Sequence, residues 1–186
     1  LLEKQKQILG INLLNFGKNN TDGYYFLRVG AKAKISGTLT VPDGVKALKV
    51  EGPNNHDEST DTDDFIPVNI SSVNVPAGKK LSLFRISVKS NSMTFTGAGE
   101  AELLNARLNT NVTAEKIKIA DAVVKSLDCK ELTSEESVCL VVSEYLSFDK
   151  AVINPDMVIY GQPGAYLKFG EIDSTGYSQT AIPMVY

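Results

Sequence analysis

The sequence predicts an all-β protein: an antiparallel β-sandwich over residues 20–100, then a β-solenoid-like or second sandwich region over 101–186, with a short N-terminal helix. From Tyr24 onward, apolar and polar residues alternate with a period of two, which is the pattern of strands with one buried face. Segments rich in Pro and Gly divide these stretches, as turns do. A weak repeat of about 20 residues distinguishes the second region.

The only helix expected at the front covers residues 1–14 (LLEKQKQILGINLL), within a helical stub and linker over 1–19. Leu and Ile return there at about heptad spacing, and Gly10 breaks the pattern. Such a short helix is marginal alone, because helix nucleation is costly. Two interpretations stay open: the end of a longer helix or coiled coil that joins subunits, and a tail whose leucines cover the core.

The strands expected in the first region are rich in β-branched and aromatic residues, as strands are. They cover residues 24–29, 31–41, 45–49, 65–75 and 80–89. The turn signals Pro42-Asp43-Gly44 and Pro76-Ala77-Gly78 separate them at hairpin-like spacing. Regular short strands divided in this way favour an antiparallel sandwich.

Residues 51–64 (EGPNNHDESTDTDD) interrupt the alternation with a polar, acidic stretch. The stretch has nothing to bury, so we expect a surface loop. Carboxylates gathered on one loop are ligands that Ca²⁺ accepts. The candidate metal ligands are Asp57, Glu58, Asp61, Asp63 and Asp64. Their spacing is not that of an EF-hand loop, and the alternative is a solvated charged loop without a metal.

Two series of short apolar segments recur about every 20 residues in the second region. The first series is 115–119, 137–141 and 156–160, and the second is 124–128, 144–148 and 165–169. The clearest match joins EYLSF (144–148) to AYLKF (165–169). Two strands per repeat are what a β-solenoid coil requires. An antiparallel sandwich would produce the same series, and we favour the solenoid.

A helix over residues 113–132 is an alternative interpretation of part of this region. Ile117, Ala120 and Val124 lie near helical spacing. The alternation of Ile117 with Ile119 argues against the helix, so a strand remains the main expectation.

Charge and composition exclude several classes of protein. The formal net charge is −3, and no basic stripe of the kind that nucleic-acid binders carry is visible. No apolar run is long enough for a membrane helix. The chain begins at Leu1 without a charged-then-apolar leader, so we expect a processed product or a fragment. Cys129 and Cys139 are too few for a disulfide framework; we interpret them as buried thiols, with one bridge as the alternative.

Catalysis that needs a histidine must use His56, because the chain has only one. The sequence contains no Gly-x-Ser-x-Gly elbow. Cys139 lies in the apolar run SVCLVV, where burial would raise the pKa of its thiol. We therefore expect a protein that is not an enzyme and holds no cofactor. The alternative is a glycan-active hydrolase that uses loop carboxylates such as Asp61 and Asp63.

Aromatic side chains are natural platforms for sugars and other flat ligands. The stretch 170–186 has Gly, Ser and Thr around Tyr177, and it is interpreted as a surface loop followed by a final strand over 181–186. Tyr177 and Tyr186 are therefore the candidate ligand-binding residues, for a glycan or a partner protein.

A helical stub that leads into hairpins and a repetitive β region resembles the fibre and appendage proteins of tailed bacteriophages. The residues that carry the resemblance are 1–17, EYLSF (144–148) and AYLKF (165–169). Those proteins commonly form trimers and expose solenoid or sandwich modules for host attachment; bacterial surface adhesins share these features. The resemblance implies a homo-oligomeric structural or attachment module of a virion or cell surface, in contact with other surface proteins and a host glycan. It assigns no functional residue.

Overall fold

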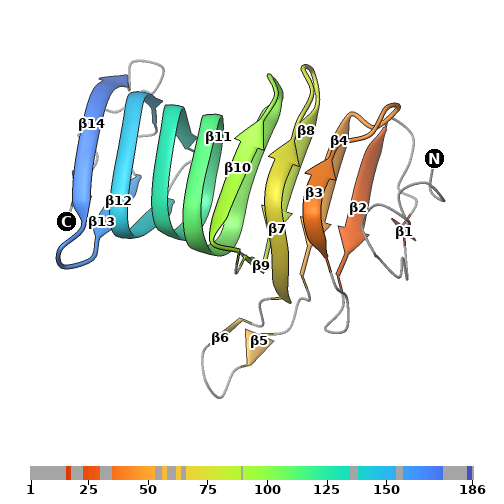
Figure 1. Cartoon of the computed structure of the whole chain (residues 1–186), viewed down its shortest axis with the longest axis horizontal. Coiled ribbons are helices and arrows are strands. Elements are labelled where there is room, and N and C mark those ends of the chain that lie inside the picture. Colours follow the sequence, from red (N-terminus) through yellow and green to blue (C-terminus); the bar gives the residue numbers. More distant parts are fainter. Residues whose placement is uncertain are drawn as a thin grey trace.

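Parallel strands stacked into successive coils form the body of the molecule (Figure 1). The structure is a computed structural model. It describes residues 16–17, 23–29, 35–52, 56–57, 62–63, 66–88, 90–134, 138–153, 157–173 and 184–185. Every regular element in these ranges is a strand. The same residues contain no helix long and apolar enough to cross a membrane.

The strands vary from short rungs to segments that run through more than one coil. In chain order they are β1 (Phe16–Gly17), β2 (Tyr24–Arg28), β3 (Ser36–Thr40), β4 (Ala47–Glu51), β5 (His56–Asp57), β6 (Thr62–Asp63), β7 (Ile66–Asn74), β8 (Lys80–Phe84), β9 (Ile86–Val88), β10 (Ser92–Thr96), β11 (Glu100–Ser134), β12 (Cys139–Val152), β13 (Val158–Gly161), β14 (Tyr166–Asp173) and β15 (Met184–Val185). β11 is 35 residues long, which is more than one coil.

The coils build three parallel ladders, which we name A, B and C. Ladder A contains β2, β4, β8, residues 100–104, 116–120 and 131–134 of β11, 150–152 of β12 and 171–173 of β14. Ladder B contains the start of β7, then β9, residues 107–108 and 122–124 of β11, the start of β12, β13 and β15. Ladder C contains β3, the end of β7, β10, residues 111–115 and 126–130 of β11, 145–149 of β12 and 166–170 of β14.

A single hydrophobic core fills the space between the ladders, from Leu27 to Ile159. The alternation in the sequence supplies it: in β10, Met93 and Phe95 are buried between exposed polar neighbours. Each coil therefore adds a layer of side chains to its neighbours' layers. Full burial of an aliphatic side chain stabilises a fold by about 1.5–3 kcal/mol, so the stacking of coils is what holds the fold together.

The corner between ladders A and B has the same backbone conformation in successive coils. Arg85, Asn105 and Asp121 all have positive φ, at 53°, 46° and 66°. Asn and Asp tolerate this left-handed region better than most residues. The backbone N–H of Arg85 donates to the carbonyl of Asn105 at 3.1 Å, and the carboxylate of Asp121 accepts from the N–H of Cys139 at 2.7 Å. The corner residues thus link each coil to the next.

The predicted antiparallel pairing of residues 20–100 is wrong. β2, β4 and β8 pair in parallel, and so do β3, β7 and β10. The turn at Pro42, whose carbonyl accepts from the N–H of Val45 at 3.2 Å, joins ladder C to ladder A within one coil. Alternation shows which side of a strand is buried, not which strand pairs with it. The solenoid predicted for the second region is confirmed, and the same coils continue into the first.

The two helix predictions have different outcomes. Residues 1–14 lie outside the described residues, and within the stub and linker over 1–19 the described pair Phe16–Gly17 is strand β1, antiparallel to β2. The alternative helix over 113–132 is wrong, because these residues lie in β11. Their inward side chains, such as Ile117 and Ile119, are buried on a period of two.

The predicted repeat is confirmed for its clearest pair. EYLSF lies directly beside AYLKF, with Tyr145 paired to Tyr166 and Phe148 to Phe169. The Phe rings stack at 5.2 Å between centroids. In the other series, residues 139–141 and 158–160 align on ladder B. Segment 115–119 does not, because it runs from ladder C into ladder A, and residues 122–124 pair with 140–142 instead.

Candidate functional site

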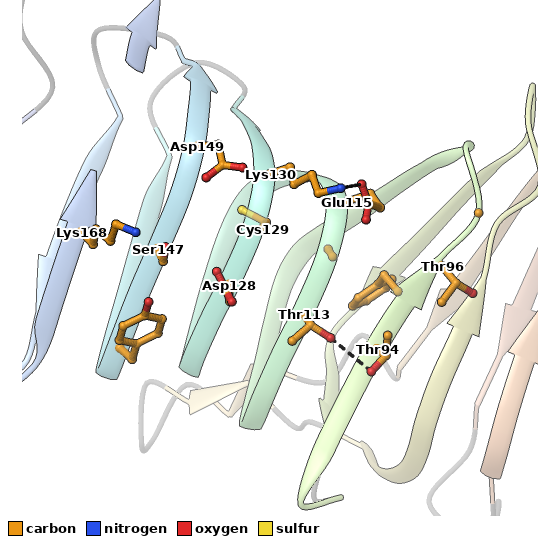
Figure 2. A pocket seen from close by; sticks show the side chains of 14 residues that line it. Thr94, Thr96, Thr113, Glu115, Asp128, Cys129, Lys130, Ser147, Asp149 and Lys168 are labelled. Atoms are coloured by element: carbon orange, nitrogen blue, oxygen red, sulfur yellow. Dashed lines mark hydrogen bonds and ion pairs between the residues drawn. The ribbon is translucent and has the colours of Figure 1, made fainter. Parts of the chain in front are cut away.

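A polar groove of about 680 Å³ lies on the outer side of ladder C. Its walls come from β10, β11, β12 and β14 (Figure 2). The lining residues are Thr94, Phe95, Thr96, Gly97, Thr113, Ala114, Glu115, Asp128, Cys129, Lys130, Tyr145, Ser147, Asp149 and Lys168. They come from segments up to about four coils apart in the sequence, so only the stacking of coils brings them together.

Hydroxyl groups dominate the end of the groove near β10. Side chains at equivalent outward positions of successive coils form a row along ladder C. In four successive coils this row carries a hydroxyl, from Thr38, Ser72, Thr94 and Thr113. The hydroxyl of Thr113 donates to that of Thr94 at 3.1 Å (Figure 2). The parallel register places equivalent side chains at the spacing of neighbouring strands, about 4.7–4.9 Å. The result is a regular row of hydroxyl groups that a ligand can contact.

Charged side chains replace these hydroxyls toward β14. The same row continues with Asp128, Ser147 and Lys168. Beside it, the Lys130 ammonium lies 2.8 Å from a carboxylate oxygen of Glu115. The hydrogen bond and charge of Glu115 raise the pKa of Lys130 above its ordinary value. Within the described residues, Asp128 and Lys168 form no side-chain hydrogen bond or ion pair, so a ligand could use both groups.

A stacked pair of tyrosines borders this charged end. The Tyr145 and Tyr166 rings lie 5.9 Å apart between centroids, with 8° between their planes. Tyr145 lines the groove, and Tyr166 is 63% exposed on the next coil. An exposed aromatic ring beside hydrogen-bonding groups is an arrangement that suits contact with a sugar ring.

The cysteine in the groove wall is held in its thiol form. Burial raises the pKa of the Cys129 thiol to about 12, with smaller contributions from Asp128 and Asp149. The thiolate is the reactive form, so Cys129 is protonated near neutral pH. Cys139 is half-buried, and burial raises its pKa as well. Both cysteines are free; Cys129 is the buried thiol that the sequence predicted.

The groove therefore offers hydroxyls, carboxylates, ammonium groups and aromatic faces, but no imidazole among its lining residues. Among the residues that the structure describes, no group of three or more His, Cys, Asp and Glu side chains is placed to hold a metal ion. The groups that line this site can form hydrogen bonds and ring contacts with a ligand.

The sequence-predicted site residues lie elsewhere. His56 and Asp57 form β5, which pairs antiparallel with Thr62 and Asp63 of β6, so part of the expected loop is a hairpin that projects from the solenoid (Figure 1). For these residues the structure describes the backbone only. Glu58, Asp61 and Asp64 lie outside the described residues, and so do Tyr177 and Tyr186.

Sequence reasoning missed the tyrosine pair as a site, although the signal was present. Tyr145 and Tyr166 occupy equivalent positions of EYLSF and AYLKF. Equal positions in a solenoid repeat must stack on one ladder. The other groove residues carried no comparable signal, because coils of unequal length conceal their alignment.

Comparisons with protein-family models, with curated protein sequences and with solved structures found no match to this chain.

Proposed function

We propose that this protein is a non-enzymatic attachment module that binds an extended polysaccharide along the outer side of ladder C. The observation that carries the proposal is the Tyr145–Tyr166 stack, at 5.9 Å, at the charged end of a polar groove. A location on a virion appendage or a cell surface, with other surface proteins as partners, stays a prediction from the resemblance.

The shape of the groove supports a linear ligand. Its lining residues extend from β10 to β14, across several rungs of one ladder. A chain of sugar units could lie across the rungs and meet a similar set of groups at each step, because the rungs repeat at about 4.7–4.9 Å. A small ligand would need a more enclosed pocket that buries most of its surface.

The chemistry of the lining supports a sugar ligand over nucleic acid. Thr94 and Thr113 supply exposed hydroxyls, and Asp128 and Lys168 supply charged partners for the hydroxyl groups of a sugar. The groove holds three carboxylates and two ammonium groups, which does not favour a polyanion, since polyanions need an excess of basic groups.

Binding to an array of linear polysaccharides, including bacterial capsular polysaccharides and O-antigens, tests the proposal. With a polysaccharide that binds, we expect Tyr166→Ala to weaken the affinity about tenfold, which corresponds to about 1.4 kcal/mol. Tyr160→Ala is the matched control, because Tyr160 is 44% exposed but lies on ladder B. The affinity of the Tyr160→Ala variant for the polysaccharide should equal that of the unaltered protein.

Three results would reject the proposal. The first is that no polysaccharide on the array binds, and the second is that Tyr166→Ala and Tyr160→Ala weaken binding equally. The third is release of new reducing ends from the bound polysaccharide, which would make the protein a hydrolase. In that case, loss of hydrolysis on joint replacement of Asp61 and Asp63 would favour the loop carboxylates as catalysts.

A further inference from the structure

β14 ends ladders A and C in the part of the chain that the structure describes. It pairs with β12 on one side, and no described strand pairs with its other side. An unpaired strand edge presents N–H and C=O groups that can pair with another chain. At the opposite end of ladder A, β1 already covers part of β2 in antiparallel register. The edge of β2 at Phe26 and Leu27 is therefore not open to head-to-tail pairing with another copy.

The open edge has two arms that meet at a corner. Residues 166–169 belong to ladder C and residues 171–173 to ladder A. The corner is at Gly170, where an added Cβ would collide with the carbonyl of Asp149. A two-fold axis through this corner would place the ladder C arm of one copy beside the ladder A arm of the other. The two edges would then run antiparallel.

The charges on the edge are complementary to themselves under this symmetry. With the axis between Phe169 and Gly170, Lys168 lies opposite Glu171 of the second copy, and the pair occurs twice. Lys168 and Glu171 are both exposed on the outer side. Opposite charges directly across an antiparallel pair stabilise it, and the same pairing would add to the contact of Glu171 with Lys150 at 3.9 Å in its own chain.

The apolar residues match in the same register. Leu167 would lie opposite Ile172 of the second copy. Leu167 is partly buried and packs against the core, whereas Ile172 is 42% exposed at the end of the solenoid. Ile172 alternates with Glu171 and Asp173, which both contact Lys150 on the outer side, so Ile172 points toward the inner side. A second copy would cover apolar surface that the end of the solenoid leaves exposed.

We propose that two copies of this chain associate end to end through antiparallel pairing of β14 with its symmetry mate. The occupant of the open edge is a second copy because the edge is self-complementary in both charge and apolar side chains. This inference shares Tyr166 and Lys168 with the proposed polysaccharide site, but it does not rest on polysaccharide binding, because it is tested without any ligand.

Sedimentation of the full chain over a wide concentration range tests the proposal. We expect a species of twice the monomer mass of 20.1 kDa. Glu171→Lys places two like charges across each symmetric pair and should weaken the dimer about tenfold or more. The double variant Lys168→Glu/Glu171→Lys restores opposite charges and should restore the dimer. Glu131→Lys is the matched control, because Glu131 faces Lys116 at 2.6 Å on an inner coil of ladder A.

Several outcomes would overturn the proposal. A monomer at every concentration would show that the edge is unused or is covered by the chain's own residues 174–183. A trimer or a filament would require a different contact. Equal weakening by Glu171→Lys and Glu131→Lys would indicate a general effect on folding. Circular dichroism of each variant, together with the charge-swapped pair, separates loss of the interface from loss of the fold.

Discussion

Ladders A and C are built from the same coils, but the polar groups on their outer sides differ in how far they pair with one another. On ladder A, basic and acidic residues alternate from rung to rung in the order Lys80, Glu100, Lys116, Glu131, Lys150 and Glu171. On ladder C, hydroxyls occupy the first rungs, and the charged groups that follow are only partly paired. The first surface satisfies its charges within the chain, and the second leaves groups available.

The outer side of a parallel ladder can therefore stabilise the fold through paired charges or leave polar groups accessible, according to which residues recur on it. Opposite charges on neighbouring rungs attract because the register holds them side by side. The network on ladder A includes Glu102, 7% exposed, which accepts from the Ser82 hydroxyl at 2.5 Å and lies 3.2 Å from the Lys80 ammonium. A recurring row of exposed hydroxyls makes few such contacts, so we expect that it can be replaced with little loss of stability.

The largest effect is expected from Glu102→Ala on ladder A. The change leaves the Ser82 hydroxyl without its acceptor and removes the shared carboxylate from Lys80 and Lys118. We expect the free energy of unfolding, measured by urea denaturation, to fall by about 2–3 kcal/mol. Asp128→Ala on ladder C is the control and should stay within about 0.5 kcal/mol. Equal losses in the two variants would remove the distinction between the ladders.

A smaller effect is expected at the corner that follows ladder A. Asp121→Ala places alanine at a φ of 66° and removes the acceptor for the Cys139 N–H. We expect the free energy of unfolding to fall by about 1–2 kcal/mol. Asp121→Asn keeps an acceptor oxygen and a residue that tolerates this φ, so its unfolding curve should lie near that of the unaltered protein. No difference between Ala and Asn would contradict this role of the corner.

The pH dependence of ladder A should appear at alkaline pH. Burial lowers the pKa of Lys80, but its bonds and charge interactions with Glu100 and Glu102 raise it more, so the net pKa lies above 10.5. A raised pKa in the folded state adds stability that is fully present below pH 10.5 and lost as the pH rises through the folded value. The contribution is about 0.5–1 kcal/mol, since the Lys80 side chain is only partly buried and solvent screens its charge. The difference in Tm between the protein and Lys80→Met should therefore vanish at high pH; a constant difference would exclude the charge as its cause.

The smallest effect is expected on the hydroxyl row of ladder C. Thr94→Val and Thr113→Val replace exposed hydroxyls with a residue that suits strands. Thermal unfolding should give a stability within about 0.5 kcal/mol of the unaltered protein, while binding of a polysaccharide identified on the array should weaken. A stability loss as large as that of Glu102→Ala would mean that ladder C is also a structural surface.

The sequence predicted the strands better than their partners. The alternation at Met93 and Phe95 correctly predicted which side of the strand is buried. The EYLSF–AYLKF repeat correctly predicted that these two segments stack on each other. The residues of the turn at Pro42 predict a hairpin, because a turn within a coil and a turn between antiparallel strands use the same types of residue. Of the candidate site, only the tyrosine pair could have been found from the sequence, because the two tyrosines occupy equivalent positions of the repeat. The groove residues Thr94, Asp128 and Lys168 are too far apart along the chain for any local pattern to join them.

Local periodicity in the sequence is enough to show that the chain is all-β, which side chains face the core and that two segments repeat. The parallel pairing of the stacked strands, and the outward side chains that share a row, depend on the tertiary structure. Rows form between residues 15 to 34 positions apart, as Ser126 and Asn111 or Thr38 and Ser72 are. Their alignment depends on the length of every intervening turn, which the stacking of coils sets and no local pattern encodes.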